Sequence, residues 1–154
     1  MLEGDNMRKF EIVTKRTSNC EIKMPHRATK NSAGYDFYST IECVIEPNTT
    51  KLIFSDIKAQ FPNDEVLILC TTSGMGKRGV MLANGIGIID ADYYNNENNE
   101  GNLGFMLRNL GIEPYVVKVG DKIGQGIFTN FFAVDDEEEI TAERVGGFGS
   151  TVKN

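Results

Sequence analysis

The sequence predicts an all-β fold, built as a sandwich or distorted barrel of short strands. Short apolar stretches recur at near-regular spacing, and no part of the chain shows helical periodicity of any length. Turn-forming residues such as Pro47-Asn48 separate these stretches. A chain of 154 residues can bury a core, so we expect one barrel domain over residues 7–137 and a flexible C-terminal arm over residues 138–154.

The strands expected outside the centre of the chain are separated by polar or glycine-rich connections. Residues 20–30 are polar and contain Pro25, which indicates a surface connection. Residues 66–70 are apolar on both faces, as in a strand in the middle of a sheet. Residues 71–79 are rich in glycine and interrupt the pattern. The expected strands cover residues 10–13, 36–39, 41–46, 50–61, 66–70, 115–119 and 123–134.

Residues 79–109 are expected to form a central hairpin of two apolar strands joined by a polar turn that carries carboxylates. The two-residue period of a strand places Ile86, Ile88 and Asp90 on one face and two glycines on the opposite face. Glycines on one face allow a flat group or another backbone to approach closely. Asp90 ends the first strand, where a rigid scaffold can hold a carboxylate at a cleft.

The net charge of −6 argues against nucleic acid or an anionic membrane as the main partner, because both need a basic surface. No apolar run approaches the roughly 20 residues of a membrane span, and we expect no secretory leader. Three cysteines without paired spacing favour a reducing, cytoplasmic setting. Residues 1–6 precede a second methionine, Met7, and we interpret them as an extra leader outside the fold.

Asp90 and Asp92 are the first candidates for chemistry. They are either turn acids that accept hydrogen bonds from nearby backbone N–H groups, or a general base and a ligand of metal-bound water. A calcium-binding loop is excluded, because the sixth position counted from Asp90 is Asn95 instead of glycine and the twelfth is Gly101 instead of glutamate.

Three further stretches have both a structural and a functional interpretation. Tyr93 and Tyr94 either pack the turn against the sheet or provide a platform for a sugar or base. Residues 72–79 offer hydroxyls, glycine N–H groups and two cations, and form either an anion-binding nest or a plain surface turn. The arm places Phe148 among glycines near Arg144, a composition suited to a lid that stacks on a ring and binds phosphate.

Taken together, five stretches resemble the five motifs of the trimeric dUTPase family, the deoxyuridine 5′-triphosphate nucleotidohydrolases, in the family's own order. The asparagine-rich insertion and the spacing between Arg144 and Phe148 are similar to the bacterial or phage branch. The resemblance implies a jelly-roll protomer and a homotrimer with three active sites at subunit junctions. It also implies Mg²⁺-assisted hydrolysis of dUTP to dUMP and pyrophosphate by in-line water attack on the α-phosphate. The matching stretches are residues 33–39, 72–79, 84–93, 120–125 and 147–151.

The resemblance also implies a role for each matched residue. Asp90 would activate the water, Tyr93 would pack under the deoxyribose, and Phe148 would stack on the uracil. In the family one subunit supplies motifs one, two and four, a second supplies motif three, and a third lends its arm as a lid. Asp36 would support the magnesium ion indirectly, through water. The other implied substrate-binding residues are Asn84, Gly85 and Ile89 at the base, and Ser73, Gly74, Gln125, Arg144, Ser150 and Thr151 toward the phosphates.

The chain departs from the family pattern in motif two, where Thr72 stands in place of the usual arginine. Lys122 replaces an arginine in motif four, and Val152 follows the fifth motif where glycine is usual. Two alternatives therefore stay open. One is a non-catalytic or weakly active dUTP-binding, regulatory trimer. The other is a dCTP deaminase-like enzyme of the same fold, against which residues 103–109 carry no catalytic glutamate.

Overall fold

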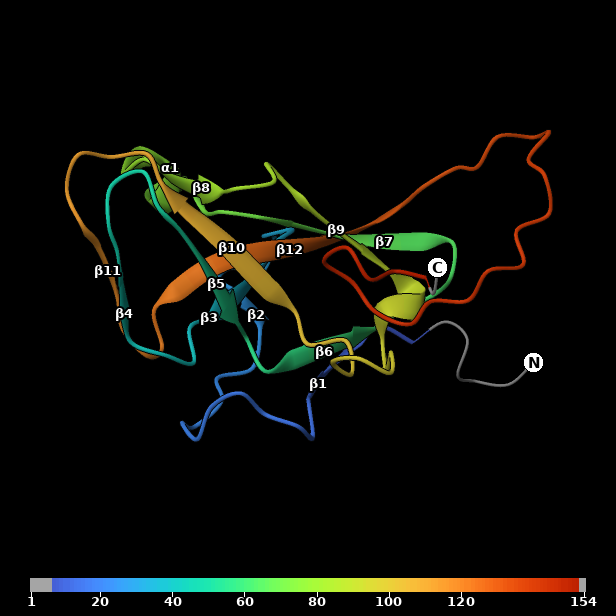
Figure 1. Cartoon of the computed structure of the whole chain (residues 1–154), viewed down its shortest axis with the longest axis horizontal. Coiled ribbons are helices and arrows are strands. Elements are labelled where there is room, and N and C mark those ends of the chain that lie inside the picture. The colour runs from blue at the N-terminus through green and yellow to red at the C-terminus, as the bar shows by residue number, and fades with distance from the viewer. Residues whose placement is uncertain (1–6, 153–154) are drawn as a thin grey trace.

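The computed structural model describes residues 7–152, so the expected leader at residues 1–6 lies outside the described part of the chain. The fold is all-β, as the sequence predicts, and its only described helices are α1 (Ser73–Lys77) and the 3₁₀ turn η1 (Ala91–Tyr93) (Figure 1). The strands are β1 (Lys9–Ile12), β2 (His26–Arg27), β3 (Tyr35–Tyr38), β4 (Cys43–Ile45), β5 (Thr50–Phe54), β6 (Ile57–Gln60), β7 (Glu65–Cys70), β8 (Val80–Leu82), β9 (Gly87–Asp90), β10 (Gly104–Asn109), β11 (Tyr115–Val117) and β12 (Lys122–Asn130).

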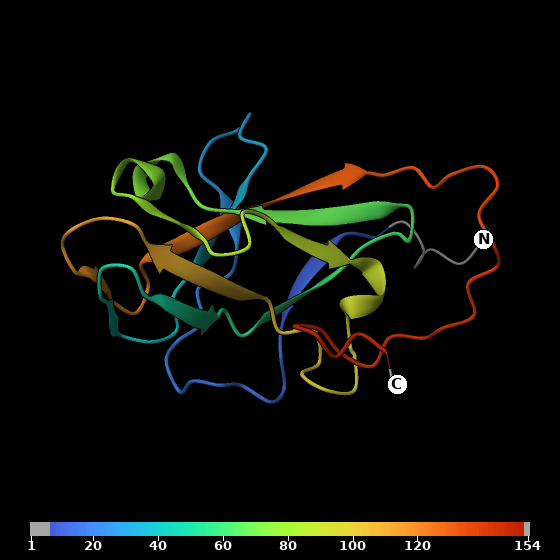
Figure 2. The same ribbon diagram turned by 45° about the horizontal axis from the view of Figure 1, so that its top comes forward.

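The strands form a five-stranded sheet, β2-β3-β12-β7-β9, a three-stranded sheet, β5-β10-β8, and two strand pairs, β1-β6 and β11-β4. The core lies between the two larger sheets, where the Phe37 ring of β3 meets the Phe105 ring of β10 at 5.2 Å. Gly124 of β12 permits this packing, since a Cβ atom there would lie only 2.4 Å from the Phe105 ring. The turned view in Figure 2 shows β7, β12 and β9 on one side and β5 and β10 on the other.

The predicted central hairpin is confirmed only in part: its first strand is divided into β8, which pairs antiparallel with β10, and β9, which belongs to the other large sheet. β9 pairs with β7, whereas β10 pairs with β5 and β8. Gly87 permits the pairing of β9 with β7, since a Cβ added at this position would lie only 3.1 Å from the Cβ of Leu69. This close approach is the one that glycine in a strand allows. η1 and the asparagine-rich bend then carry the chain across to the other sheet.

The two-residue period predicted for β9 is confirmed. Ile86 and Ile88 are about half exposed, and Asp90 is exposed on the same side, while Gly87 is buried. The carboxylate at the strand's end therefore points outward from the barrel, next to two exposed isoleucines.

Three other expectations need correction. The strand expected over residues 50–61 is broken at Asp56, whose φ of 57° turns the chain and whose buried carboxylate accepts hydrogen bonds from Thr17 and Ser18. The surface connection at residues 20–30 contains β2, which pairs with β3. The glycine-rich break contains α1, because the Thr72 hydroxyl accepts from the Met75 N–H and caps the helix.

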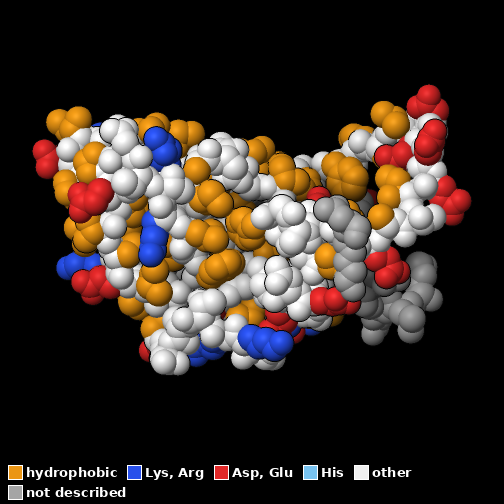
Figure 3. All heavy atoms as spheres, viewed as in Figure 1, with side chains coloured by type: hydrophobic (Ala, Val, Ile, Leu, Met, Phe, Trp, Pro, Cys, Tyr) orange, Lys and Arg blue, Asp and Glu red, His pale blue; other side chains and the backbone are white. Residues whose placement is uncertain are grey.

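The segment that follows β12 leaves the barrel, swings outward and returns against η1 (Figure 1). Its acidic run, residues 135–139, is exposed, and red side chains gather on this protruding loop in Figure 3. The exposure of this run agrees with the prediction that the chain leaves the core and enters solvent here. Within residues 7–152, no helix has both the length and the apolar character needed to cross a membrane.

Candidate active site

A cavity of about 350 Å³ lies between the end of β9, η1 and the returning arm. It brings together the third and fifth motifs, which the sequence separates by more than fifty residues. Of the predicted substrate-binding residues, Asn84, Ile89, Tyr93, Arg144, Phe148 and Thr151 line it beside Asp90. The remaining lining residues are Leu69, Gly87, Ile88, Gly104 and Gly147.

Asp90 is the last residue of β9 and precedes the first residue of η1. Its carboxylate accepts a hydrogen bond from Arg144 of the arm, and the same guanidinium donates to Asp92 at 2.5 Å. Arg144 also donates to the carbonyl of Gly146 at 2.9 Å, which bends the arm over the site. Arg144, which the resemblance assigns to phosphate binding, is therefore paired with the carboxylates of Asp90 and Asp92 within the single chain.

Tyr93 forms the floor of the cavity and is 5% exposed. Its burial raises the pKa of the phenol, although a hydrogen bond from Asn99 opposes the rise. Gly147 lies flat on the ring, since a Cβ there would be 2.8 Å from Cε2 of Tyr93. Tyr94 instead donates to Glu11 on β1 and lines none of the cavity. Tyr93 therefore lies at the cavity, whereas Tyr94 packs against β1.

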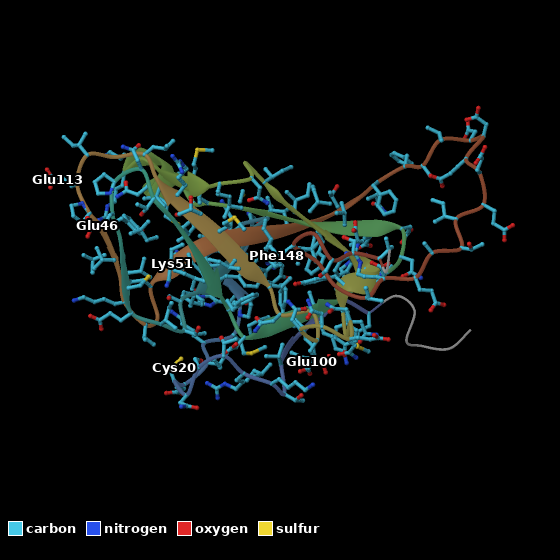
Figure 4. All side chains as sticks on the ribbon, viewed as in Figure 1. Cys20, Glu46, Lys51, Glu100, Glu113 and Phe148 are labelled. Carbon is cyan, nitrogen blue, oxygen red and sulfur yellow. The ribbon has the colours of Figure 1, made fainter. Side chains whose placement is uncertain are left out.

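The arm brings Phe148 over the barrel, where its ring meets that of Phe54 edge to face at 6.1 Å (Figure 4). Phe148 has a φ of 52° and remains 56% exposed, so one side of its ring is free to stack. Ser150 donates to the carbonyl of Gly147 at 2.7 Å and does not line the cavity. Gly85 has a φ of 78° in the turn before β9 and also lies outside the lining.

The remaining predicted residues gather elsewhere. Gln125 of β12 lies opposite Asp36 of β3 in the sheet register, and its amide donates to the Thr71 carbonyl at 3.3 Å. Ser73 and Gly74 are the first two residues of α1, which begins two residues after Thr71. Gln125 packs against Gly34, where a Cβ atom would lie 2.2 Å from Oε1. The first, second and fourth motifs thus form a second cluster, which contributes nothing to the cavity beside Asp90.

The register of β7 sets the distance between the two clusters. Asp90 lies opposite Val66 on one side of β7, and Gln125 lies opposite Cys70 on the other side. Four residues along a strand and two strand spacings across it separate their Cα atoms by about 16 Å. Because Gln125 is turned toward Thr71 and Asp90 toward the arm, the two side chains do not face a common point. One chain therefore keeps the two groups of predicted site residues apart.

Metal ligands are sparse in the described part of the chain. No group of three or more His, Cys, Asp or Glu among residues 7–152 is placed to hold a metal ion. Asp36 is the carboxylate to which the resemblance gives an indirect role; it is buried, and its Oδ2 pairs with the ammonium of Lys122 at 2.8 Å. A carboxylate oxygen of this kind can accept from a metal-bound water.

Sequence reasoning missed two asparagines that support the cavity. Asn99 and Asn102 both bond to the Tyr93 hydroxyl group from the bend that follows η1. They lie at the edge of a biased stretch, residues 95–100, whose composition resembles an unstructured linker. The feature of the sequence that could have identified these asparagines is that the stretch comes just after the third motif.

An all-β barrel whose C-terminal arm folds over a cavity lined by a carboxylate, a guanidinium and two aromatic rings defines a class of small protein with a site for a polar, ring-containing ligand. A sequence model of the dUTPase family matches residues 20–152. The deoxyuridine 5′-triphosphate nucleotidohydrolase of Lactococcus lactis is 42% identical over 147 residues, which cover 94% of this chain and 97% of that protein. The protein of the same name from Coxiella burnetii strain Dugway is 36% identical, with coverage of 95% and 97%.

Solved structures of dUTPases superpose on this chain. The dUTPase of Streptococcus mutans superposes with a TM-score of 0.73 at 35% identity and covers 82% of this chain and 98% of that one. The dUTPase of phage phi11 of S. aureus gives a TM-score of 0.70 over 88% of this chain and 99% of that one; at 23% identity it supports the fold alone. The chain belongs to the dUTPase family, whose enzymes hydrolyse dUTP to dUMP.

Proposed function

We propose that this dUTPase hydrolyses dUTP to dUMP and pyrophosphate in a site assembled from half-sites of different subunits, with Asp90 as the residue that activates water. The observation that carries this proposal is the cavity in which Asp90, Tyr93 and Phe148 come together. It offers a carboxylate, a platform for the sugar and a ring that stacks on a base, within reach of one nucleotide.

The reaction needs positioning and charge neutralisation more than covalent chemistry. Asp90 accepts the proton of a water that attacks the α-phosphorus in line, and pyrophosphate leaves on the opposite side. Arg144 is bound to Asp90 in the free chain, and we propose that the triphosphate draws this guanidinium away. The exchange frees the carboxylate for its role as base and turns the arm's cation toward the phosphates.

The second half-site would hold the phosphate chain. Ser73, Gly74 and Gln125 supply hydroxyl, backbone N–H and amide donors, and Ser150 and Thr151 of the arm add two hydroxyls. Asp36 would hold water bound to a magnesium ion. That ion would neutralise triphosphate charge that a chain of net charge −6 offsets poorly. A variant of the phage phi11 dUTPase is described with a structural Mg(II) ion, which is compatible with this assignment.

A homotrimer would bring the half-sites together. The exposed isoleucines on the face of β9 that carries Asp90, Ile86 and Ile88, are suited to burial by a neighbouring subunit. We further propose that the arm, residues 138–154, closes a neighbouring subunit's site in the assembly, although it lies over its own chain's cavity here. The three free cysteines and the acidic charge suit a cytoplasmic enzyme whose partner is a nucleotide, without a nucleic acid or membrane partner.

One observation favours the weakly active, dUTP-binding alternative. Thr72, which replaces the usual arginine of motif two, caps α1 with its hydroxyl and supplies no cation beside Ser73. The deaminase-like alternative has less support, because β10 (Gly104–Asn109) carries no carboxylate.

The test is release of pyrophosphate from dUTP, measured beside dCTP, dTTP and UTP, each with and without Mg²⁺. The proposal predicts rapid release from dUTP alone and a strong dependence on Mg²⁺. Tight binding of dUTP without release would instead support the binding protein, and ammonia release from dCTP would support a deaminase.

A further inference from the structure

The bend between η1 and β10 holds the Tyr93 hydroxyl from two sides. The hydroxyl donates to the backbone carbonyl of Asn102 at 3.1 Å and accepts from Nδ2 of Asn99 at 2.7 Å. A phenol has one hydrogen to donate, and the bond to the Asn102 carbonyl uses it. The hydroxyl oxygen accepts the second bond, from Asn99. Together the two bonds fix the far end of a ring whose face forms the cavity floor.

Asn99 is itself locked in one orientation. Its Oδ1 accepts from the N–H of Gly101 at 3.1 Å and from Nδ2 of Asn96 at 2.9 Å. Its backbone N–H donates to Oδ1 of Asn96 at 3.1 Å. Reversing the amide would direct its NH₂ at two donors, so only the observed orientation satisfies the bend. Asn96 in turn donates to the Tyr93 carbonyl at 2.8 Å, which closes the network on both ends of Tyr93.

The opposite side of the ring faces the arm. Gly147 lies against it, and the guanidinium carbon of Arg144 is 6.0 Å from its centre. The ring therefore lies between the bend, which bonds to its hydroxyl end, and the arm, which contacts it through Gly147.

We propose that Asn99 is a positioning residue that fixes the Tyr93 ring and thereby sets the preference for deoxyribose over ribose nucleotides. This inference rests on the proposed packing of Tyr93 under the sugar. A 2′-hydroxyl adds a single oxygen, and a ring rejects it only if the ring cannot retreat. Without the Asn99 amide, the hydroxyl end of Tyr93 can shift into the bend and admit the larger sugar.

The experiment measures the dissociation constants of α,β-imido-dUTP and α,β-imido-UTP by calorimetry, and kcat/KM for dUTP and UTP. The variants are Asn99→Ala, Asn99→Asp, Tyr93→Phe and the double variant with Asn99→Ala. Asn99→Asp keeps the two accepted bonds and replaces the NH₂ with a carboxylate oxygen, to which the Tyr93 hydroxyl can donate, so it keeps a hydrogen bond between the two side chains. Asn98→Ala is the matched control, since its amide contacts Ser150 at 3.4 Å and does not touch Tyr93.

We expect the preference for dUTP over UTP to fall about tenfold in Asn99→Ala, because a lost hydrogen bond shifts the equilibrium by about that factor. Tyr93→Phe should show a similar loss, Asn99→Asp should lose less because its carboxylate can accept from the Tyr93 hydroxyl, and the double variant should lose no more than either Asn99→Ala or Tyr93→Phe. Asn98→Ala should keep the wild-type preference. A general loss of folding would lower binding of both analogues together and leave their ratio unchanged.

An Asn99→Ala protein that melts like the wild type and keeps its preference within twofold would overturn the inference. So would a wild-type protein that binds both analogues equally. If Asn99→Ala fails to fold, Tyr93→Phe decides, and an unchanged preference in that variant overturns the inference as well. The binding ratio needs no turnover, so an inactive wild-type enzyme would contradict the proposed function and still leave this test intact.

Discussion

Asp90 stands where β9 ends and η1 begins, with its carboxylate bound by Arg144 of the arm. Asp92, two residues on, bonds to the same guanidinium. Asp90 lines the cavity with Tyr93 and Phe148 and Asp92 does not, while both carboxylates line a second hollow beside Asn63 and Phe131. The two carboxylates therefore share a partner but differ in their access to substrate.

Replacing Asp90 with asparagine keeps the shape of the site and removes the proton acceptor. We expect Asp90→Asn to lower kcat for dUTP by about 10³-fold, the range of general-base catalysis, and to leave binding of α,β-imido-dUTP largely intact. Asp92→Asn is the matched control and should change kcat by less than tenfold. Near-normal turnover in Asp90→Asn would remove Asp90 as the base.

Thr72 offers a second test at this scale. Thr72→Arg would place a cation beside Ser73 and should raise kcat/KM severalfold, while loss of the helix cap costs about 1 kcal/mol of stability. Thr72→Ala loses the same cap without adding a cation, so its stability should fall equally with no gain in activity. If steady-state kinetics show equal activity in both variants, another residue already neutralises the phosphate.

At the scale of elements, the sequence predicted which residues of a segment are exposed, but it predicted only in part which strands pair with one another. The outward face of β9 and the solvated acidic run follow from residue type at each position. The pairing of β9 with β7 depends on the fit of Gly87 against Leu69, two residues far apart in the sequence. The short helix α1 was missed because a threonine cap, and not helical periodicity, stabilises it. Likewise, the composition of the bend concealed asparagines that form an ordered network.

The bend is fastened to the rest of the barrel by Glu100, which lies beside β6 in Figure 4. Its carboxylate accepts from Lys58 at 2.7 Å and from the backbone of Thr14 at 2.9 Å. The hydrogen bond from Lys58, followed by that from Thr14, lowers the pKa of Glu100 from 4.5 to about 2. The folded state therefore favours the ionised form, and this stabilisation is present above pH 4.5 and is lost as the pH falls toward 2.

Glu100→Gln should lower the melting temperature at pH 6 by a few degrees, and the difference from wild type should vanish as the pH approaches 2. Calorimetric scans across this range make the comparison. Glu97→Gln, on the exposed side of the same bend, should match the wild type throughout. A constant difference between Glu100→Gln and wild type at every pH would show that the carboxylate's charge is not the source of the stabilisation.

The arm is the other element that completes the site. Deleting residues 146–154 removes Phe148 and both hydroxyls of the fifth motif while leaving every barrel strand in place. We expect at least a hundredfold loss of kcat/KM for dUTP without a loss of the folded assembly, since a lid orders the substrate and excludes water. Kinetics and analytical ultracentrifugation report the two properties separately. An unchanged rate would refute the role of the arm as a lid.

At the scale of the molecule, the distribution of the motifs matters most. β7 separates Asp90 at one end from Gln125 at the other, so a single chain does not bring the two groups of predicted site residues together, and we proposed above that each is half of a site. The resemblance of five motifs to a family predicted which residues act, and the register shows which of them one chain brings together. An assembly of identical chains in a closed ring can complete every site with one type of contact.

The most direct measurement of this claim mixes two inactive proteins. Asp90→Asn inactivates the half-site that contains Asp90, and Gln125→Ala inactivates the half-site that contains Gln125. After the two are unfolded and refolded together in equal amounts, about a quarter of the sites in randomly assembled trimers combine two intact halves. We expect pyrophosphate release from dUTP to recover to about this share of the wild-type rate, whereas each variant refolded alone should stay inactive. A mixture as inactive as its components would contradict this expectation and would place both halves of each site in the same chain.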